Sequence, residues 1–184
     1  MKKMLSLLTA LCLVCLCASA FADVTASSPL TLDGFTLNLD AGIKYDLGTK
    51  TAQQVYITVY PYSAAGDTAT NFNFVWAGTT QTITAADVKA ELPGLRQQMI
   101  DGLKGYGYTV DSLDYDDPSD GTISGEACIV SNAKLVMSAY GQSMTLYQRQ
   151  LYVGSKGFVI TISAADTATL DAVTALLNST LAWN

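Results

Sequence analysis

Carboxylates are the main side chains in this sequence that could carry polar chemistry. The chain has 184 residues, of which 16 are Asp or Glu and none is histidine. Ser-His and Cys-His nucleophilic catalysis need an imidazole base, and the common zinc sites also depend on histidine. These classes of site are therefore excluded. We predict no catalytic, cofactor-binding or metal-binding residue and no cofactor, so an enzymatic role stays open but is the less favoured one.

The densest group of carboxylates precedes Gly121. It consists of Asp111, Asp114, Asp116, Asp117 and Asp120. Calcium takes six to eight oxygen ligands, but Pro118 stands where a helix-loop-helix calcium loop needs a ligand, and Gly125 stands where it needs the bidentate Glu. Because charge runs usually form solvated surfaces, we interpret the segment as an acidic turn. Weak cation binding and acid-base catalysis by paired carboxylates are the alternatives.

Three of the four cysteines, Cys12, Cys15 and Cys17, lie in an apolar run near the amino terminus. The fourth, Cys128, lies in an apolar stretch. Free cysteine is among the most buried residue types, so we interpret Cys128 as a small hydrophobic strand residue rather than a reactive thiol.

The amino terminus has the pattern of a secretory signal peptide. Lys2 and Lys3 precede an apolar run from Met4 to about Cys17, and Ala20-Phe21-Ala22 has small residues where signal peptidase requires them. A membrane-spanning helix needs about 20 apolar residues, and this run is shorter. We therefore predict cleavage after Ala22 and a secreted or periplasmic protein without a membrane anchor. No lipoprotein-type processing site precedes the three cysteines.

Cleavage changes the charge balance of the chain. Losing Lys2 and Lys3 leaves 8 basic against 16 acidic residues, a net charge of −8, and no internal disulfide can form with Cys128 alone. A basic nucleic-acid surface and electrostatic docking on anionic lipid are both disfavoured. About 160 residues suit one domain with an ordinary core. We predict a signal peptide at 1–22, a tether at 23–31 and a single domain at 32–184.

Apolar residues alternate with polar ones in several segments, which predicts half-buried strands. Turn residues separate them, with a tight hairpin turn at Tyr140–Ser143 and another turn at Gly154–Gly157. The predicted strands are Phe35–Leu39, Val55–Val59, Phe72–Trp76, Ile123–Val130, Leu135–Tyr140, Met144–Val153 and Phe158–Ile162.

Two segments have helical spacing instead. The first is predicted over Thr84–Lys104, with Thr84 and Asp87 as a capping box. Within it, Pro93-Gly94 removes one backbone donor and is expected to kink the helix or start a second one. The last helix is predicted to begin after a cap at Asp166 and to end near Trp183.

Strands, a helix, more strands and a terminal helix indicate an α+β fold with a mainly antiparallel sheet. The order of Asp33–Leu37, the helix at Thr84–Lys104, Gly125–Ala127, and the strand pair Tyr147–Val153 and Gly157–Ser163 resembles the Mog/PsbP/DcrB superfamily. The resemblance covers about Leu32 to Trp183. It implies an αβα sandwich and a binding or assembly module, and it supplies no functional residues.

Tyrosines near strand ends or loops offer a second indication of function, because tyrosine joins large contact area to a polar tip. Tyrosine is also simply a good strand residue. We favour a non-enzymatic module that binds an envelope or secreted protein of unknown identity; the alternative is a carboxylate-based hydrolase or carbohydrate-directed enzyme. Two carboxyl groups about 5 to 10 Å apart across a cleft would favour the enzyme. The tyrosines in question are Tyr56, Tyr60, Tyr62, Tyr106, Tyr108 and Tyr115.

Overall fold

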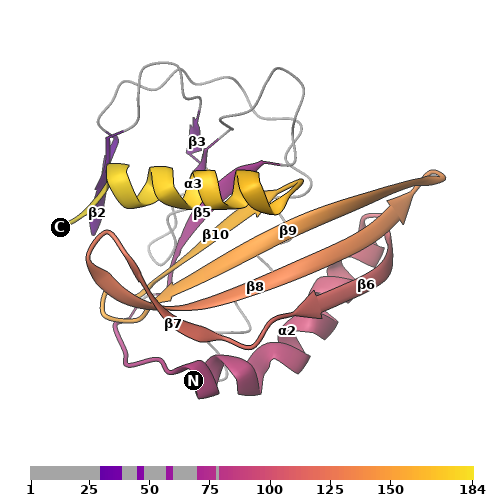
Figure 1. Ribbon diagram of the computed structural model, residues 1–184, viewed down its shortest axis with the longest axis horizontal. Helices are drawn as coiled ribbons and strands as arrows, with labels where there is room; N and C mark the ends of the chain where they lie inside the picture. Colours follow the sequence, from indigo (N-terminus) through magenta and orange to yellow (C-terminus); the bar gives the residue numbers. More distant parts are fainter. Residues whose placement is uncertain (1–29, 39–44, 48–56, 60–69, 78) are drawn as a thin grey trace.

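The computed structural model describes residues 30–38, 45–47, 57–59, 70–77 and 79–184 (Figure 1). The predicted signal peptide, its cleavage position after Ala22, and Tyr56, Tyr60 and Tyr62 lie outside the described residues. Two residues of the predicted tether, Leu30 and Thr31, belong to a strand. The predicted α+β class is confirmed, since a mainly antiparallel sheet is combined with two helices.

The main sheet contains eight strands in the order β3-β4-β5-β10-β9-β8-β6, with β7 also paired to β8. Every pairing among the described strands is antiparallel. The strands are β3 (Tyr45–Leu47), β4 (Ile57–Val59), β5 (Asn71–Trp76), β6 (Thr109–Tyr115), β7 (Ser119–Ile123), β8 (Glu126–Ala139), β9 (Gln142–Val153) and β10 (Phe158–Ala164).

The longest feature of the sheet is the β8–β9 hairpin, which extends to the right in Figure 1. The prediction of two strands, Ile123–Val130 and Leu135–Tyr140, is wrong at this point, because β8 is continuous from Glu126 to Ala139. The residues between the predicted strands keep the period of two, with Ser131 and Ala133 buried. Burial on one face therefore continues through a stretch that the sequence presents as polar.

Helix α2 (Ala85–Gly105) begins with the predicted capping box. Asp87 N donates to Thr84 Oγ1 over 3.2 Å, and Thr84 N donates to Asp87 Oδ2 over 3.0 Å. Pro93 lies inside one uninterrupted helix, so no second helix starts there. Among the described residues, no helix is long and apolar enough to span a membrane.

Helix α3 (Thr167–Thr180) begins at the predicted cap, where Thr169 N donates to Asp166 Oδ1 over 2.7 Å. The prediction that this helix continues to near Trp183 is wrong. Leu181–Trp183 forms β11 instead, which pairs with β2 (Phe35–Leu37) in a second sheet with β1 (Leu30–Leu32). Trp183 packs against Phe35 with ring centroids 6.3 Å apart, so burial of the indole ends the helix.

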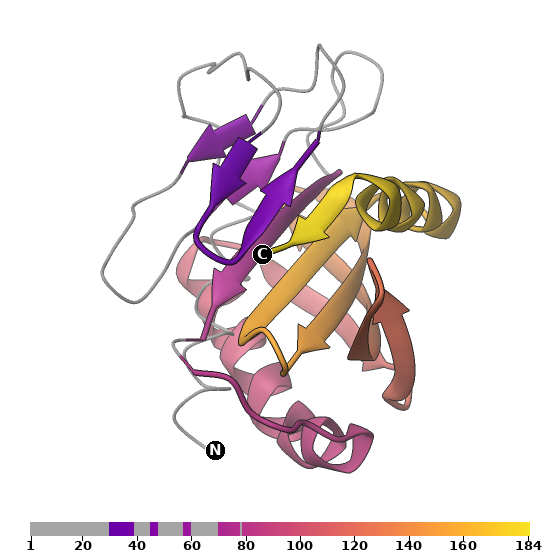
Figure 2. The same cartoon turned by 90° about the vertical axis from the view of Figure 1, so that its left-hand side faces the viewer.

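The helices cover opposite faces of the main sheet, as Figure 2 shows from the side. Along β10, Phe158, Ile160 and Ile162 share a core with residues of α3. Val159, between them in sequence, packs in a different cluster with Val88 of α2. Successive strand residues point to opposite faces, so this alternation defines an αβα sandwich. Phe72 and Phe74 of β5 also belong to the core shared with α3.

Candidate functional site

The predicted acidic turn is mostly strand. Asp111 and Asp114 lie on β6 and Asp120 lies on β7, so only 116–118 connects the two strands. Both strands pair with β8, which spreads the carboxylates along a sheet edge instead of gathering them in one loop. Asp114 lies opposite Lys134, and Asp117 Oδ1 is 2.7 Å from Lys89 Nζ.

A metal site requires several ligands to converge. Within the described part of the chain, no group of three or more His, Cys, Asp or Glu side chains could hold a metal ion. All five aspartates of the acidic segment are exposed. Their arrangement therefore fits a solvated strand edge, where charged side chains also discourage pairing with other chains.

Cys128 is a buried free cysteine, as the sequence predicted. It lies on the α3 face of β8 and is 4% exposed. Burial raises the pKa of its thiol to about 11 because the charged thiolate is poorly solvated there. The predicted burial of this strand residue is confirmed, and a thiol with a raised pKa is protonated at neutral pH, so we expect it to react slowly.

A surface pocket of about 590 Å³ lies at one end of the β8–β9 hairpin. The segment Thr80–Ile83, which leads into α2, forms one wall, and Ile129 and Tyr152 contribute from the sheet. This wall is fixed by a hydrogen bond of 2.9 Å from Gln81 N to the carbonyl of Gly154. The pocket is therefore built on backbone contacts between a loop and the β9–β10 turn.

Two carboxylates line this pocket, Asp120 and Glu126. Glu126 already accepts a hydrogen bond of 3.0 Å from Ser155 and lies 3.4 Å from Lys156 Nζ. Glu126 pairs with Ile123, so these two side chains lie on the same face of the sheet. Asp120 is three residues from Ile123 along β7, and because successive strand residues alternate between faces, its side chain starts from the opposite face. The two carboxylates are therefore about 10 Å apart along the strands. Their positions differ from the opposed acid and base of a glycosidase.

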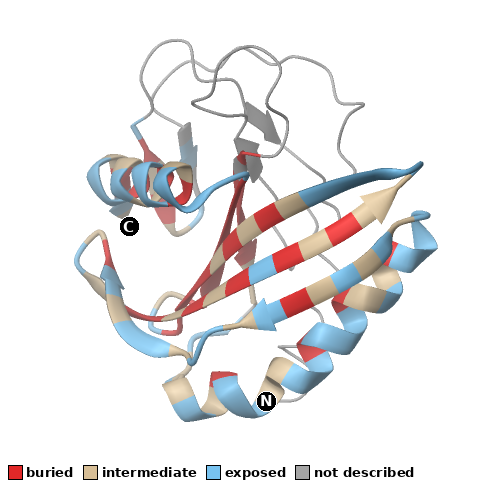
Figure 3. Cartoon of the chain, turned by 45° about the vertical axis from the view of Figure 1, so that its right-hand side comes forward, coloured by how far each residue is buried: buried red, intermediate tan, exposed pale blue. Residues whose placement is uncertain are grey.

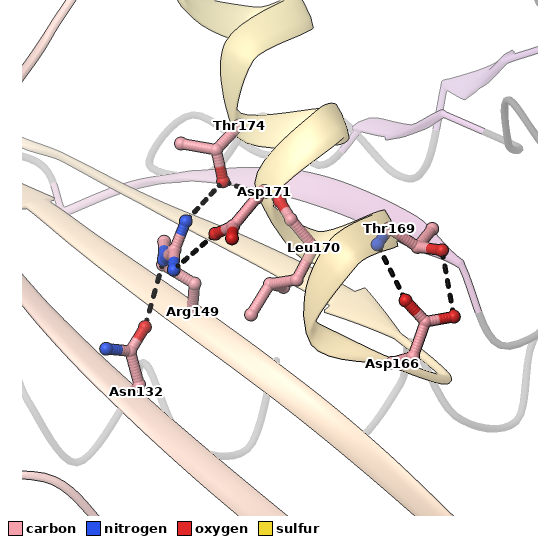
Figure 4. Close-up of polar contacts among 7 residues, drawn as sticks. All are labelled: Asn132, Arg149, Asp166, Thr169, Leu170, Asp171 and Thr174. Atoms are coloured by element: carbon pink, nitrogen blue, oxygen red, sulfur yellow. Dashed lines mark hydrogen bonds and ion pairs between the residues drawn. The ribbon is translucent and has the colours of Figure 1, made fainter.

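The other cluster of charged side chains fixes α3 to the sheet (Figure 4). Arg149 of β9 donates from Nε to Asn132 Oδ1 and from Nη1 to Thr174 Oγ1, both over 2.9 Å. Its Nη2 lies 2.9 Å from Asp171 Oδ1, and its side chain is 20% exposed. The guanidinium uses its planar fork to join two strands and a helix, which is a structural role.

Large exposed hydrophobic side chains occur at three positions among the described residues. Tyr140 forms the tip of the β8–β9 hairpin and is fully exposed, Met144 follows on β9, and Tyr106 caps the end of α2. The chain from Tyr106 enters β6, whose first residue Thr109 pairs with Ser138 beside the tip. We call Tyr106, Tyr140 and Met144 the hairpin end. Exposed and partly exposed residues also dominate this end in Figure 3.

The backbone at Tyr140 is unusual. Its φ is 51° and that of the following Gly141 is 76°, so both central residues of the turn have positive φ. Asn, Asp and Gly suit the first of these positions, whereas tyrosine is rare there. The predicted hairpin turn is therefore confirmed, but its first residue is one that local turn preferences do not favour.

One other described non-glycine residue has positive φ, Ser124, at 49°. Its conformation has a local reason, because Ser124 N donates to Asn178 Oδ1 over 2.6 Å and its hydroxyl lies 3.2 Å from the carbonyl oxygen of Asn178. These bonds tie the β7–β8 turn to α3. Tyr140 has a fully exposed ring instead, so packing does not account for its conformation.

The other described tyrosines of the sequence analysis have packing roles. Tyr108 and Tyr115 are half-buried against the cluster formed by Met99 and Leu103 of α2. Sequence reasoning grouped Tyr106 with them and missed Tyr140 and Met144. The Tyr-Gly dipeptide in a predicted hairpin turn was the signal that could have identified the tip.

No known protein family matches the chain, and no curated protein matches it. The crystal structure of LpqN from Mycobacterium tuberculosis, a protein described as involved in cell envelope biogenesis, is similar to this chain. The similarity covers 89% of this chain and 90% of that chain, with 16% sequence identity and a TM-score of 0.39.

Proposed function

We propose that residues 23–184 form a non-enzymatic module that acts outside the cytoplasm and binds another secreted or envelope protein through the hairpin end. The location rests on the signal-peptide pattern of Lys2, Lys3 and Ala20–Ala22. The order of strands and helices also supports a Mog/PsbP/DcrB-like fold for this module.

The observation that carries the proposed binding role is Tyr140. A left-handed conformation in a non-glycine residue costs about 1 to 3 kcal/mol, and residues strained in this way are concentrated at functional sites. Here the strained residue presents a whole aromatic ring to solvent. The strain is therefore associated with exposing the ring, which suits contact with a partner.

The residues beside Tyr140 fit the same role. Met144 is 49% exposed and Tyr106 is 55% exposed. Tyrosine and methionine are enriched at protein interfaces, where aromatic rings provide area at low entropic cost and methionine adapts its shape. A partner surface with apolar pockets and polar surroundings would bury all three side chains.

Carboxylate catalysis is the weaker alternative. Glu126 is held by Lys156 and Ser155, and Asp120 projects from the other face of the sheet. A hydrolase of this type needs one carboxyl group on each side of the bond that it cleaves. The hairpin end has a strained and fully exposed Tyr140 ring, whereas the pocket lacks an opposed pair of carboxylates. We therefore favour protein binding.

The test uses Tyr140→Asn, because asparagine suits a left-handed turn position and preserves the hairpin. Immobilised wild-type domain, Tyr140→Asn and the control Thr122→Asn would each be exposed to envelope and medium fractions of the host. Thr122 is exposed on β7, at the other end of the sheet.

A protein retained at fixed stoichiometry by the wild type and Thr122→Asn, and lost by Tyr140→Asn, would support the proposed surface. Crosslinking from position 144 would then place the partner beside the tip. Equal retention by all three baits would exclude the hairpin end as the binding surface. Retention by none would argue against a protein-binding function.

A further inference from the structure

Helix α2 is attached to the sheet by two separate apolar clusters. Val88 and Leu92 in its first half pack with Ile129 and Tyr152. In its second half, Met99 and Leu103 belong to a different cluster that includes Leu135 and Met137 of β8. Since both sets of contacts follow β8 in the same order, α2 runs alongside this strand.

Polar side chains separate the two clusters on the same face of the sheet. Ser131 lies between Ile129 and Ala133 on β8, Gln150 is opposite Ser131, and Gln148 is opposite Ala133. Ser131 and Gln148 are each 1% exposed. We call Ser131, Gln148 and Gln150 the polar band. Between Leu92 and Met99 the helix buries only Leu95, which belongs to neither apolar cluster.

The polar band has unused hydrogen-bonding capacity. Gln148 Nε2 donates to Ser163 Oγ over 3.2 Å, but Gln148 Oε1 and Ser131 Oγ find no hydrogen-bond partner among the described residues. A buried polar atom without a partner is destabilising, so in native proteins such atoms usually bond to another protein group or to ordered water. Two such atoms on neighbouring strands indicate a place for a small polar molecule.

The weakest point of α2 lies between its two apolar attachments. Pro93 lacks a backbone N–H and crowds the preceding turn, and Gly94 lowers helix propensity further. Both residues are exposed, and a Cβ added at Gly94 would have no atom within 4 Å. Gly94 therefore contributes no side-chain contact that a bend at this point would break.

The pocket lies at the start of the same half of α2. Its lining includes Ile83, Ile129 and Tyr152. The hydroxyl of Tyr152 donates to Gln150 Oε1 over 2.6 Å, so the pocket lining directly contacts the polar band. Two residues along a strand span about 7 Å, which is the distance from Ile129 to Ser131.

Besides the apolar contacts of Val88 and Leu92, one charged contact holds the first half of α2 at the sheet edge. Lys89 Nζ lies 2.7 Å from Asp117 Oδ1, and their side chains are 61% and 80% exposed. Exposed ion pairs contribute little stability, so this contact can open readily.

We propose that Ala85–Leu92 is a lid hinged at Pro93-Gly94, and that raising it joins the pocket to the polar band to form a site for a small uncharged sugar or polyol. The band carries only hydroxyl and amide groups. Gln148 Oε1 requires a hydrogen-bond donor, which a hydroxyl supplies without bringing a charge into a buried site.

The lid can be tested by thiol labelling of the native protein. On a Cys128→Ala background, Ser131→Cys places a thiol under the lid, and Ala133→Cys places the matched control under the second half of α2. We expect labelling at position 131 to be at least tenfold faster. Replacing Pro93 and Gly94 by alanine should remove that difference, and Lys89→Ala should increase it. Equal labelling rates at positions 131 and 133 would contradict the proposed lid. So would an unchanged difference in rate after Pro93 and Gly94 are replaced by alanine.

Hydrogen exchange on the unmodified domain provides a second measurement that depends on no core substitution. Amides of 89–92 should exchange at least tenfold faster than those of 100–103. A single rate along the whole helix would contradict a hinge.

Glucose is the probe for the site itself. In NMR titrations of the unmodified domain, glucose should produce saturable shifts of the Gln148 side-chain amide and of Ser131, and Gln148→Leu should abolish saturation elsewhere in the pocket. No saturation up to about 100 mM, the weak limit of useful affinity, would overturn the assigned ligand class. Saturation that survives Gln148→Leu would place the sugar outside the polar band.

Discussion

Replacing Arg149 by methionine should loosen α3 from the sheet. The guanidinium makes one hydrogen bond to Asn132, one to Thr174 and an ion pair with Asp171. Methionine fills most of the volume of the arginine stem but supplies no donor. The substitution therefore isolates the polar contacts shown in Figure 4 from the packing around them.

The magnitude follows from the exposure of each partner. Asp171 is 67% exposed, so its ion pair contributes about 0 to 1 kcal/mol. The hydrogen bonds from the 20% exposed guanidinium involve a charged donor, for which about 1.5 kcal/mol each is a low-end value. We expect a total loss of about 3 kcal/mol. At about 2 to 4 °C per kcal/mol for a domain of this size, Tm should fall by roughly 6 to 12 °C.

Thermal and urea unfolding of five proteins would measure this effect: wild type, Arg149→Met, Arg149→Lys, Thr174→Val and Asp171→Asn. Thr174→Val should cost about 1 to 2 kcal/mol, and Asp171→Asn less than about 1 kcal/mol. Arg149→Lys keeps the charge without the planar fork and should resemble Arg149→Met. If Asp171→Asn lowered stability as much as Arg149→Met, or if Arg149→Met left Tm unchanged, the assignment of hydrogen bonds as the main contribution would be refuted.

Four further outcomes are expected. Cys128, whose pKa is raised to about 11 by burial, should react with iodoacetamide at pH 8 at least 100-fold more slowly in native protein than in denaturant; similar rates would refute its burial. Hydrogen bonds from Thr169 lower the pKa of the Asp166 carboxyl, so this cap stabilises the fold above about pH 4 and stops doing so as pH falls through the lowered value. The melting temperature of Asp166→Ala should therefore be lower than that of the wild type at pH 7 and equal to it near pH 2. Gly121→Ala would place a Cβ 2.5 Å from Val130 Cγ2 and should cost about 1 to 3 kcal/mol in urea unfolding, whereas Gly105→Ala, with no atom within 4 Å, should be neutral or stabilising. Tyr140→Asn should raise Tm while it weakens partner capture, and a fall in Tm would show that the turn tolerates tyrosine without strain.

Local patterns identified many of the elements. The alternation at Phe72–Trp76 is sufficient for a strand because every second side chain is apolar, and the structure has β5 there. The caps at Thr84 and Asp166 follow from side chains that reach amides three residues away. Such signals involve contacts within one turn, so they survive in any tertiary context.

The predictions that were wrong concern segments whose structure depends on contacts with residues far away in the sequence. The acidic segment contains strand residues because β8 offers pairing partners on its free edge, which composition alone does not show. Leu181–Trp183 leaves the helical pattern because the Trp183 ring is held against Phe35, and its Nε1 donates to the carbonyl of Ile123 over 3.2 Å. Tertiary burial exceeded helix propensity there.

The sequence by itself determined the α+β class, both helix starts, the burial of Cys128 and the absence of imidazole chemistry, because composition and short-range periodicity are properties of the chain. Only the tertiary structure decided that Arg149 would join three elements, that Tyr140 would project from a strained turn, and that the polar band would lie between the two apolar clusters that hold α2. These features depend on strand register and on which helix covers which face. A shift of register by one residue would reverse the faces of every side chain involved.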